Sequence, residues 1–186
     1  MRQLVRMISE DWRVHGRAWT DPGFHALLVY RIGRHARASG NPIESTVLSV
    51  IHRIAYAFVR NLYGLEIPAT AQVGRRVRIW HHTGIMIHGG SIIGDDCQLR
   101  QGVTIGVDGI TDPSTGRIAP TLERGVSVGA GAVIAGGVTI GEGAQVGANA
   151  TVLSDVPAGA TAFVPPARVM KLKSADELPR PTSPTN

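Results

Sequence analysis

The chain has 186 residues, of which 23 are glycine and only 5% are aromatic. This length predicts one compact domain with a small appendage, and its Val, Ile, Ala and Gly content suits short strands joined by tight corners better than a globin-like or Rossmann-like domain. The net charge of +5 suits a polyanionic cofactor. The basic residues are too scattered, with too few aromatics among them, to predict binding to nucleic acid.

The single cysteine, Cys97, excludes a disulfide framework within the chain and is expected to pack rather than react. Residues 1–12 lack the apolar segment of a signal peptide, and no apolar run reaches the length of a membrane span. We therefore expect a cytoplasmic protein with no membrane partner.

Residues 1–64 are predicted to form a helical N-terminal region. Apolar residues recur at the spacing of one helix face between 23 and 38, and again between 43 and 63. Asp21-Pro22 is typical of a helix start, and the sequence Ser-Gly-Asn-Pro at 39–42 separates the two segments.

From residue 66 onward the period of the apolar residues becomes six. The longest uniform series consists of Leu122, Val128, Ile134, Ile140, Val146 and Val152. Two shorter series precede it, one of Ile67, Val73 and Ile79 and one of Ile87, Ile93, Leu99 and Ile105. This period is the signature of a parallel β-helix, in which each hexapeptide forms one side of a triangular coil and Gly permits the corner. We predict this β-helix over residues 65–172, because a single unit cannot bury its apolar face without stacking.

The period fails between Ile105 and Leu122. Residues 106–121 are rich in Gly, Asp, Pro and Thr, so they are expected to leave the coil as an extruded loop, and long loops on a rigid scaffold are usually functional. Residues 173–186 are polar and Pro-rich, which predicts a disordered tail.

Four segments in this order point to one family. They are 66–76 (EIPATAQVGRR), 80–84 (WHHTG), 101–106 (QGVTIG) and 166–168 (PAR). They resemble the first coil, the Asp-His-x-x-Gly catalytic segment, the strand before the extruded loop and the closing motif of the serine acetyltransferases. The resemblance covers roughly residues 10–172. It implies a mainly β fold, a left-handed parallel β-helix of hexapeptide repeats with a short α-helical N-terminal region. It also implies O-acetyl transfer from acetyl-CoA without a metal.

The same resemblance implies that His81 is the general base, since imidazole titrates near working pH and a neutral alcohol is a poor nucleophile. Glu66 matches the dyad carboxylate that would orient His81. It lies slightly less than one coil of three hexapeptides upstream, so the two could meet on adjacent rungs. His82 is the rival base, and a non-catalytic role for both histidines stays open. The six-residue spacing from His82 to His88 disfavours the three-histidine metal site of the γ-type carbonic anhydrases.

Acetyl-CoA is expected in a groove between neighbouring subunits. The residues that match the cofactor wall of the family, or follow it and would bind the CoA phosphates, are Thr104, Gly106, Gly129, Ala130, Ala148, Arg168 and Lys171. For the small residues, corner packing is an equally good explanation. Because the groove needs two adjacent subunits, the resemblance implies a homotrimer or a multiple of trimers. The complex with cysteine synthase is not expected, since that partnership uses a C-terminal Ile and this chain ends at Asn186.

The acceptor pocket departs from the family. Trp80 replaces an Asp, and the loop has Ile-Ala-Pro at 118–120 where the family has Arg-His-Pro to recognise an amino acid. Trp80, Arg117 and Asp108 are therefore the candidate acceptor-binding residues. Two acceptors stay open: L-serine, giving O-acetylserine for cysteine biosynthesis, and a sugar hydroxyl in polysaccharide or specialised metabolite biosynthesis. A non-catalytic β-helix assembly module is a less favoured alternative.

Overall fold

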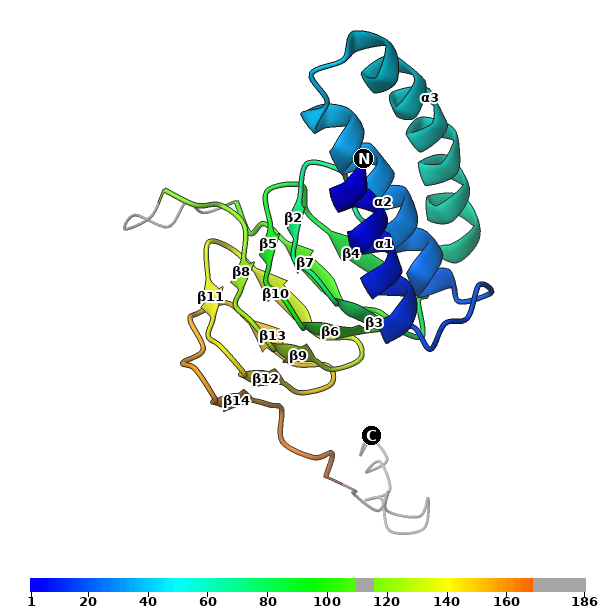
Figure 1. Ribbon diagram of the computed structural model, residues 1–186. Coiled ribbons are helices and arrows are strands. Elements are labelled where there is room, and N and C mark those ends of the chain that lie inside the picture. Colours follow the sequence, from blue (N-terminus) through cyan, green and yellow to red (C-terminus); the bar gives the residue numbers. More distant parts are fainter. Residues whose placement is uncertain (110–115, 169–186) are drawn as a thin grey trace, which may run out of the picture.

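The computed structural model describes residues 1–109 and 116–168. It consists of three helices at one end of a stack of short parallel strands, with the last strand at the opposite end (Figure 1). The predicted tail at 173–186, the candidate phosphate ligand Lys171 and the middle of the loop lie outside the described residues.

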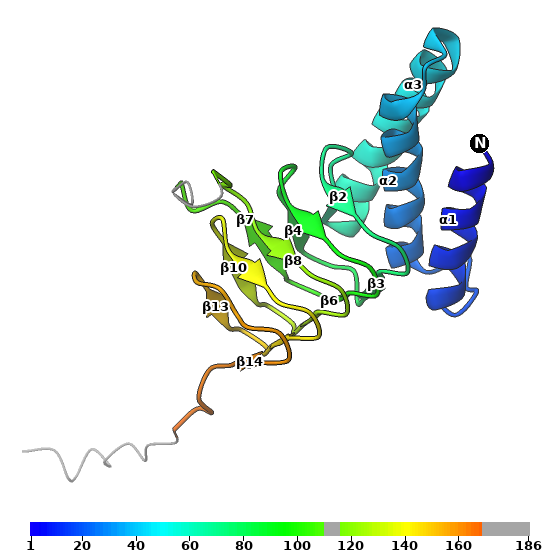
Figure 2. The ribbon, with the colours of Figure 1, turned by 60° about the vertical axis from the view of Figure 1, so that its left-hand side comes forward.

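The helices are α1 (Arg2–Val14), α2 (Pro22–Ala38) and α3 (Pro42–Phe58), and α3 continues as the π-helix η1 (Val59–Tyr63). Helices α2 and α3 begin at a proline, directly after a residue whose side chain accepts hydrogen bonds from the first turn. Asp21 Oδ1 accepts from Gly23 N at 2.8 Å, and Asn41 Oδ1 accepts from Ile43 N at 3.0 Å. One end of the α2–α3 pair projects well beyond the strand stack (Figure 2).

The strands form three parallel sheets, one for each side of the coil. The first face contains β1 (Leu65–Glu66), β4 (Ile85–Ile87), β7 (Thr104–Gly106), β10 (Val133–Ala135) and β13 (Thr151–Val152). The second face contains β2 (Gln72–Val73), β5 (Ile92–Ile93), β8 (Thr121–Leu122) and β11 (Thr139–Ile140). The third face contains β3 (Arg78–Trp80), β6 (Gln98–Arg100), β9 (Ser127–Val128), β12 (Gln145–Val146) and β14 (Thr161–Ala162). The predicted parallel β-helix with an N-terminal helical region is confirmed.

The aliphatic residue of each hexapeptide points into the coil and stacks over its equivalents. Leu122, Val128 and Ile134 are fully buried, and Leu122 is in register with Ile93 in the preceding coil. The core is therefore a column of aliphatic side chains that crosses the whole stack.

The glycine that follows these aliphatic residues has a different role from the predicted one. A Cβ on Gly129 would lie only 2.5 Å from Ala148 N in the next coil, so a side chain does not fit between the two coils. The left-handed corner conformation falls two residues later, at Gly131, whose φ is 68°. Gly129 is thus required for close approach of the coils and not for the turn.

Two coils are longer than three hexapeptides, or 18 residues. Leu65 is paired with Ile85, 20 positions later, whereas Met86 is paired with Thr104, 18 positions later. The two additional residues lie between β3 and β4, in the corner formed by residues 81–84. A second insertion, the loop at 106–121, separates β7 from β8.

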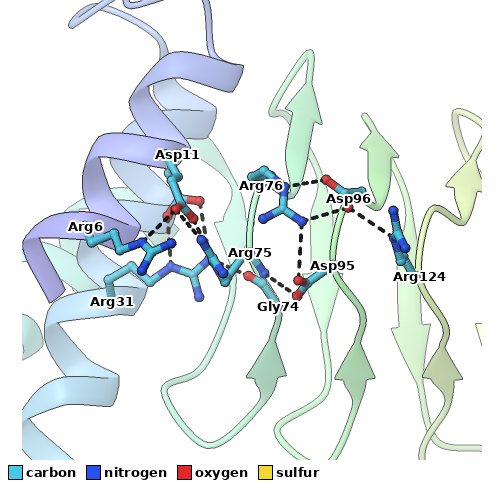
Figure 3. A network of polar contacts seen from close by, with 10 residues as sticks. Arg6, Asp11, Arg31, Gly74, Arg75, Arg76, Asp95, Asp96 and Arg124 are labelled. Atoms are coloured by element: carbon cyan, nitrogen blue, oxygen red, sulfur yellow. Dashed lines mark hydrogen bonds and ion pairs between the residues drawn. The ribbon is translucent and has the colours of Figure 1, made fainter. Parts of the chain in front are cut away.

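Helices α1 and α2 cover the open edge of the first coil (Figure 3). The strand β2 has no strand on its helical side, so its backbone groups need other partners. The buried Arg31 donates to Val73 O at 2.7 Å and binds both carboxylate oxygens of Asp11, while the Tyr30 hydroxyl accepts from Val73 N at 2.9 Å. The helical region is therefore an integral end cap of the β-helix.

Candidate functional site

The predicted base, His81, lies in the two-residue insertion, at the edge where the third face meets the first. Its side chain is exposed and its φ is 51°. Arg76, Asp96 and Asn149 adopt the same left-handed conformation at other corners, so this φ is a property of the corner and does not by itself single out His81. The corner is fixed by Gly84 N, which donates to Gly64 O at 2.9 Å, and by the His82 ring, which packs edge-on against Tyr63 with centroids 5.4 Å apart.

Three of the predicted cofactor residues lie along the same edge as His81. Gly129 and Ala130 form the corner two coils further along, and Ala148 belongs to the corner after that. The corners are joined by backbone hydrogen bonds, such as Asn149 N to Ala130 O at 2.8 Å. Because neighbouring coils are about 4.8 Å apart, Ala148 lies about 14 Å from the His81 corner along the stack. This edge thus carries His81, then the exposed Gln101 on the next corner, and only smaller residues on the two corners after that.

A groove on the adjacent first face brings together three more of the predicted residues. It has a volume of about 330 Å³ and is lined by Glu66, Pro68, Met86, Ile87, His88, Gly89, Thr104, Ile105, Gly106 and Val107. The outward side chains of Glu66, Met86 and Thr104 are in register on successive strands. The candidate carboxylate therefore lies in a groove that Thr104 and Gly106 also line.

Glu66 has a partner that the sequence analysis missed. The Tyr56 hydroxyl, on α3, donates to Glu66 Oε1 at 3.2 Å. Burial, followed by the proximity of Glu66, raises the pKa of Tyr56 to about 12, so the phenol stays protonated. Between Glu66 and His81, both within the described chain, there is no hydrogen bond or ion pair. The predicted Glu66–His81 dyad therefore remains a prediction, although the His81 corner is bonded to Gly64, two residues before Glu66.

The candidate acceptor-binding residues lie away from this groove within one chain. Trp80 is on the outer side of the third face, where its indole N–H donates to Gln98 Oε1 at 3.2 Å and the Arg78 guanidinium lies 4.2 Å from the ring centroid. Arg117 donates to Thr139 Oγ1, on the second face, at 2.9 Å.

Two further candidates lie at the ends of the coil segments. Asp108 lies at the start of the extruded loop, with a carboxylate oxygen 2.7 Å from the position that a Cβ on Gly136 would take. The candidate phosphate ligand Arg168 is exposed and follows β14 at the far end of the stack.

Cys97 is fully buried, and burial raises the pKa of its thiol to about 11, as expected for a packing residue. In residues 1–109 and 116–168, no three His, Cys, Asp or Glu side chains converge as metal ligands would. None of the helices in those ranges is both long and apolar enough to cross a membrane.

Residues 119–154 match the family model of the bacterial transferase hexapeptide with six repeats, and the three-faced stack places the chain among the hexapeptide-repeat proteins. The chain is 38% identical over 165 residues to a serine acetyltransferase of Helicobacter pylori, a match that covers 86% of this chain and 89% of that relative. The chain belongs to the serine acetyltransferase family.

Other relatives are longer. A serine acetyltransferase of Synechococcus elongatus is 37% identical over a match that covers 62% of this chain and 43% of that relative. One of Salmonella typhimurium is 34% identical over a match that covers 83% of this chain and 53% of that relative. The chain thus spans about half the length of several curated relatives. Among solved structures, a serine acetyltransferase in complex with CoA has a TM-score of 0.65 and 32% identity over 82% of this chain and 58% of that one. A serine acetyltransferase of Entamoeba histolytica shares the fold, with a TM-score of 0.73 and 21% identity over 92% of this chain and 62% of that one.

Proposed function

We propose that the protein is an acetyl-CoA-dependent serine O-acetyltransferase with His81 as general base and Glu66 as the carboxylate that orients it. The observation that carries the proposal is that His81 and two corners of small residues share one edge of the β-helix, beside the first face on which Glu66 lines a groove. Neutral His81 takes the proton of the acceptor hydroxyl while the hydroxyl oxygen attacks the thioester carbonyl. The imidazolium returns that proton as the CoA thiolate leaves, so the histidine is regenerated.

Acetyl-CoA would lie along this edge, against Gly129, Ala130 and Ala148, with its reactive end near Thr104 and Gly106. The small residues of the corners at 129–132 and 147–150 support this placement, because the thiol arm can then approach backbone N–H and C=O groups there. Arg168 and Lys171 would bind the CoA phosphates.

L-serine is the proposed acceptor, with O-acetylserine supplied for cysteine biosynthesis in the cytoplasm. Support comes from the relatives named serine acetyltransferase, one of them matched over 89% of its length. The sugar alternative rested on Ile118 and Ala119, which replace Arg-His in the loop, and on Trp80 as a surface for a sugar ring. Trp80 lies on the third face, away from the Glu66 groove, and donates its N–H to Gln98, which favours serine over a sugar in that groove.

The decisive assay follows CoA release from acetyl-CoA with L-serine, with free and nucleotide-linked sugars, and with no acceptor. Serine-dependent release is expected. His81→Ala should lower kcat by about 10²–10⁴-fold while acetyl-CoA binding persists. His82→Phe is the matched control on the same corner, because it keeps a ring against Tyr63, and it should keep most of the turnover. Release only with sugars would refute the acceptor, and a severe loss in His82→Phe with a mild one in His81→Ala would move the base to His82.

We also propose that the protein works as a homotrimer or a multiple of trimers. In support, helix α3 and η1 expose a continuous apolar stripe made of Ile43, Val47, Val50, Ile51, Ile54, Phe58 and Leu62, and contiguous apolar surface of this kind marks protein contacts. Mass measurement in solution tests this assembly, and a fully active monomer would refute it.

A further inference from the structure

Helix α3 reaches the groove on the first face through one side chain. None of its residues is fully buried, yet Tyr56 is half-buried against the core and its hydroxyl lies 3.2 Å from Glu66 Oε1. Because the phenol O–H points at a carboxylate, this contact is a charge-assisted hydrogen bond, roughly twice as strong as a neutral one.

The Tyr56 ring is itself held in place by the packing of α3 on α2. It packs against the His52 ring, with centroids 5.5 Å apart, and His52 Nδ1 is 3.1 Å from Val29 O on α2. The hydroxyl position is therefore set by the interface between two helices and not by a free surface rotamer.

The hydrogen bond uses one carboxylate oxygen and leaves the other unbonded within the described residues. A tyrosine hydroxyl has a single proton to donate, so Tyr56 fixes the orientation of Glu66 without occupying the oxygen that an imidazole needs. The π-helix η1, of a kind that occurs frequently at functional sites, then brings the chain from Tyr56 to Tyr63, whose ring contacts His82 on the His81 corner.

We infer that Tyr56 is a positioning residue that holds the Glu66 carboxylate for its partner histidine, so that helix α3 is part of the active-site architecture. This inference rests on the proposed acetyl transfer. Tyr56 acts through Glu66 and touches neither substrate.

The test is a double-mutant cycle of Tyr56→Phe and Glu66→Gln, read as kcat and KM for acetyl-CoA. Tyr56→Phe keeps the ring packing and should lower kcat by about tenfold, with KM for acetyl-CoA changed by less than about twofold. In the Glu66→Gln background the same change should have almost no effect on kcat, because the two residues act as one unit. Ser45→Ala is the matched control, since Ser45 Oγ donates to Ala36 O at 2.9 Å and also joins α3 to α2.

The outcomes separate the two claims. Equal losses of kcat in Tyr56→Phe and Ser45→Ala, or additive losses in the cycle, would overturn the role of Tyr56 while leaving the transferase activity intact. No acceptor-dependent CoA release by the wild-type chain would overturn the proposed function, and this inference with it.

Discussion

Replacing Arg31 with methionine should uncouple the helical cap from the β-helix. The side chains of Arg31 and Asp11 are only 2% and 1% exposed, so Arg31→Met leaves a buried carboxylate without its cation. Removing one partner of a buried ion pair costs about 3–5 kcal/mol, and Val73 O also loses a donor. We expect a loss of about 4 kcal/mol, a large share of the roughly 5–15 kcal/mol that stabilises a typical domain.

Equilibrium unfolding in urea, followed by circular dichroism at fixed protein concentration, measures this loss. The control is Arg75→Met, because the side chains of Arg75 and Glu10 are 37% and 13% exposed, so this pair is more open to solvent than Arg31–Asp11 and its loss should cost less, since a fully exposed pair is worth about 0–1 kcal/mol. Arg31→Met combined with Asp11→Leu should recover part of the loss, since no charge is then left buried. A loss below about 1 kcal/mol for Arg31→Met alone would refute the reasoning.

Three further outcomes are expected. Buried His15 accepts a hydrogen bond from Ile79 N at 3.2 Å, and burial lowers its pKa below the ordinary value of 6.5. The unfolded chain then takes up the proton first, so stability should fall as the pH drops below 6.5. His15→Gln should flatten this part of a Tm-against-pH curve, and an unchanged slope would exclude His15 as its cause. Gly129→Ala should cost about 1–3 kcal/mol in urea unfolding because its methyl group meets backbone, and a neutral result would show that the coils can separate. L-serine should show a kcat/KM below that of family members with Arg-His in the loop, because Ile118 and Ala119 cannot supply the lost bonds, each worth about 1.5–3 kcal/mol. A kcat/KM equal to theirs would show that other residues recognise serine.

The β-helix could be predicted from the sequence because the six-residue period expresses a physical requirement at every coil, namely one buried aliphatic residue per side. The insertion that carries His81 was also visible, as the eight-residue step from Ile79 to Ile87 between two otherwise regular series. The effect of this insertion on the distance between Glu66 and His81 could not be predicted. The predicted spacing of the two residues assumed a coil of 18 residues, whereas this coil has 20.

The Tyr56 contact could not be predicted, since it depends on how α3 packs against the first coil. Within its helix Tyr56 belongs to an amphipathic pattern that reveals only which side is apolar. A single hydrogen bond between a hydroxyl on α3 and a carboxylate on β1 produces no repeating pattern in the sequence. The positions of Trp80 and Arg117 could not be predicted either. The face of the β-helix on which each side chain lies follows from the coil register and not from its place in a motif.

The two insertions show that corners and faces of this β-helix can change independently. Two additional residues at one corner and a long loop at another leave the described strands on either side of them in parallel register. Selection, or an engineer, can therefore lengthen a corner to alter reactivity or acceptor choice without redesigning the aliphatic column that keeps the protein folded.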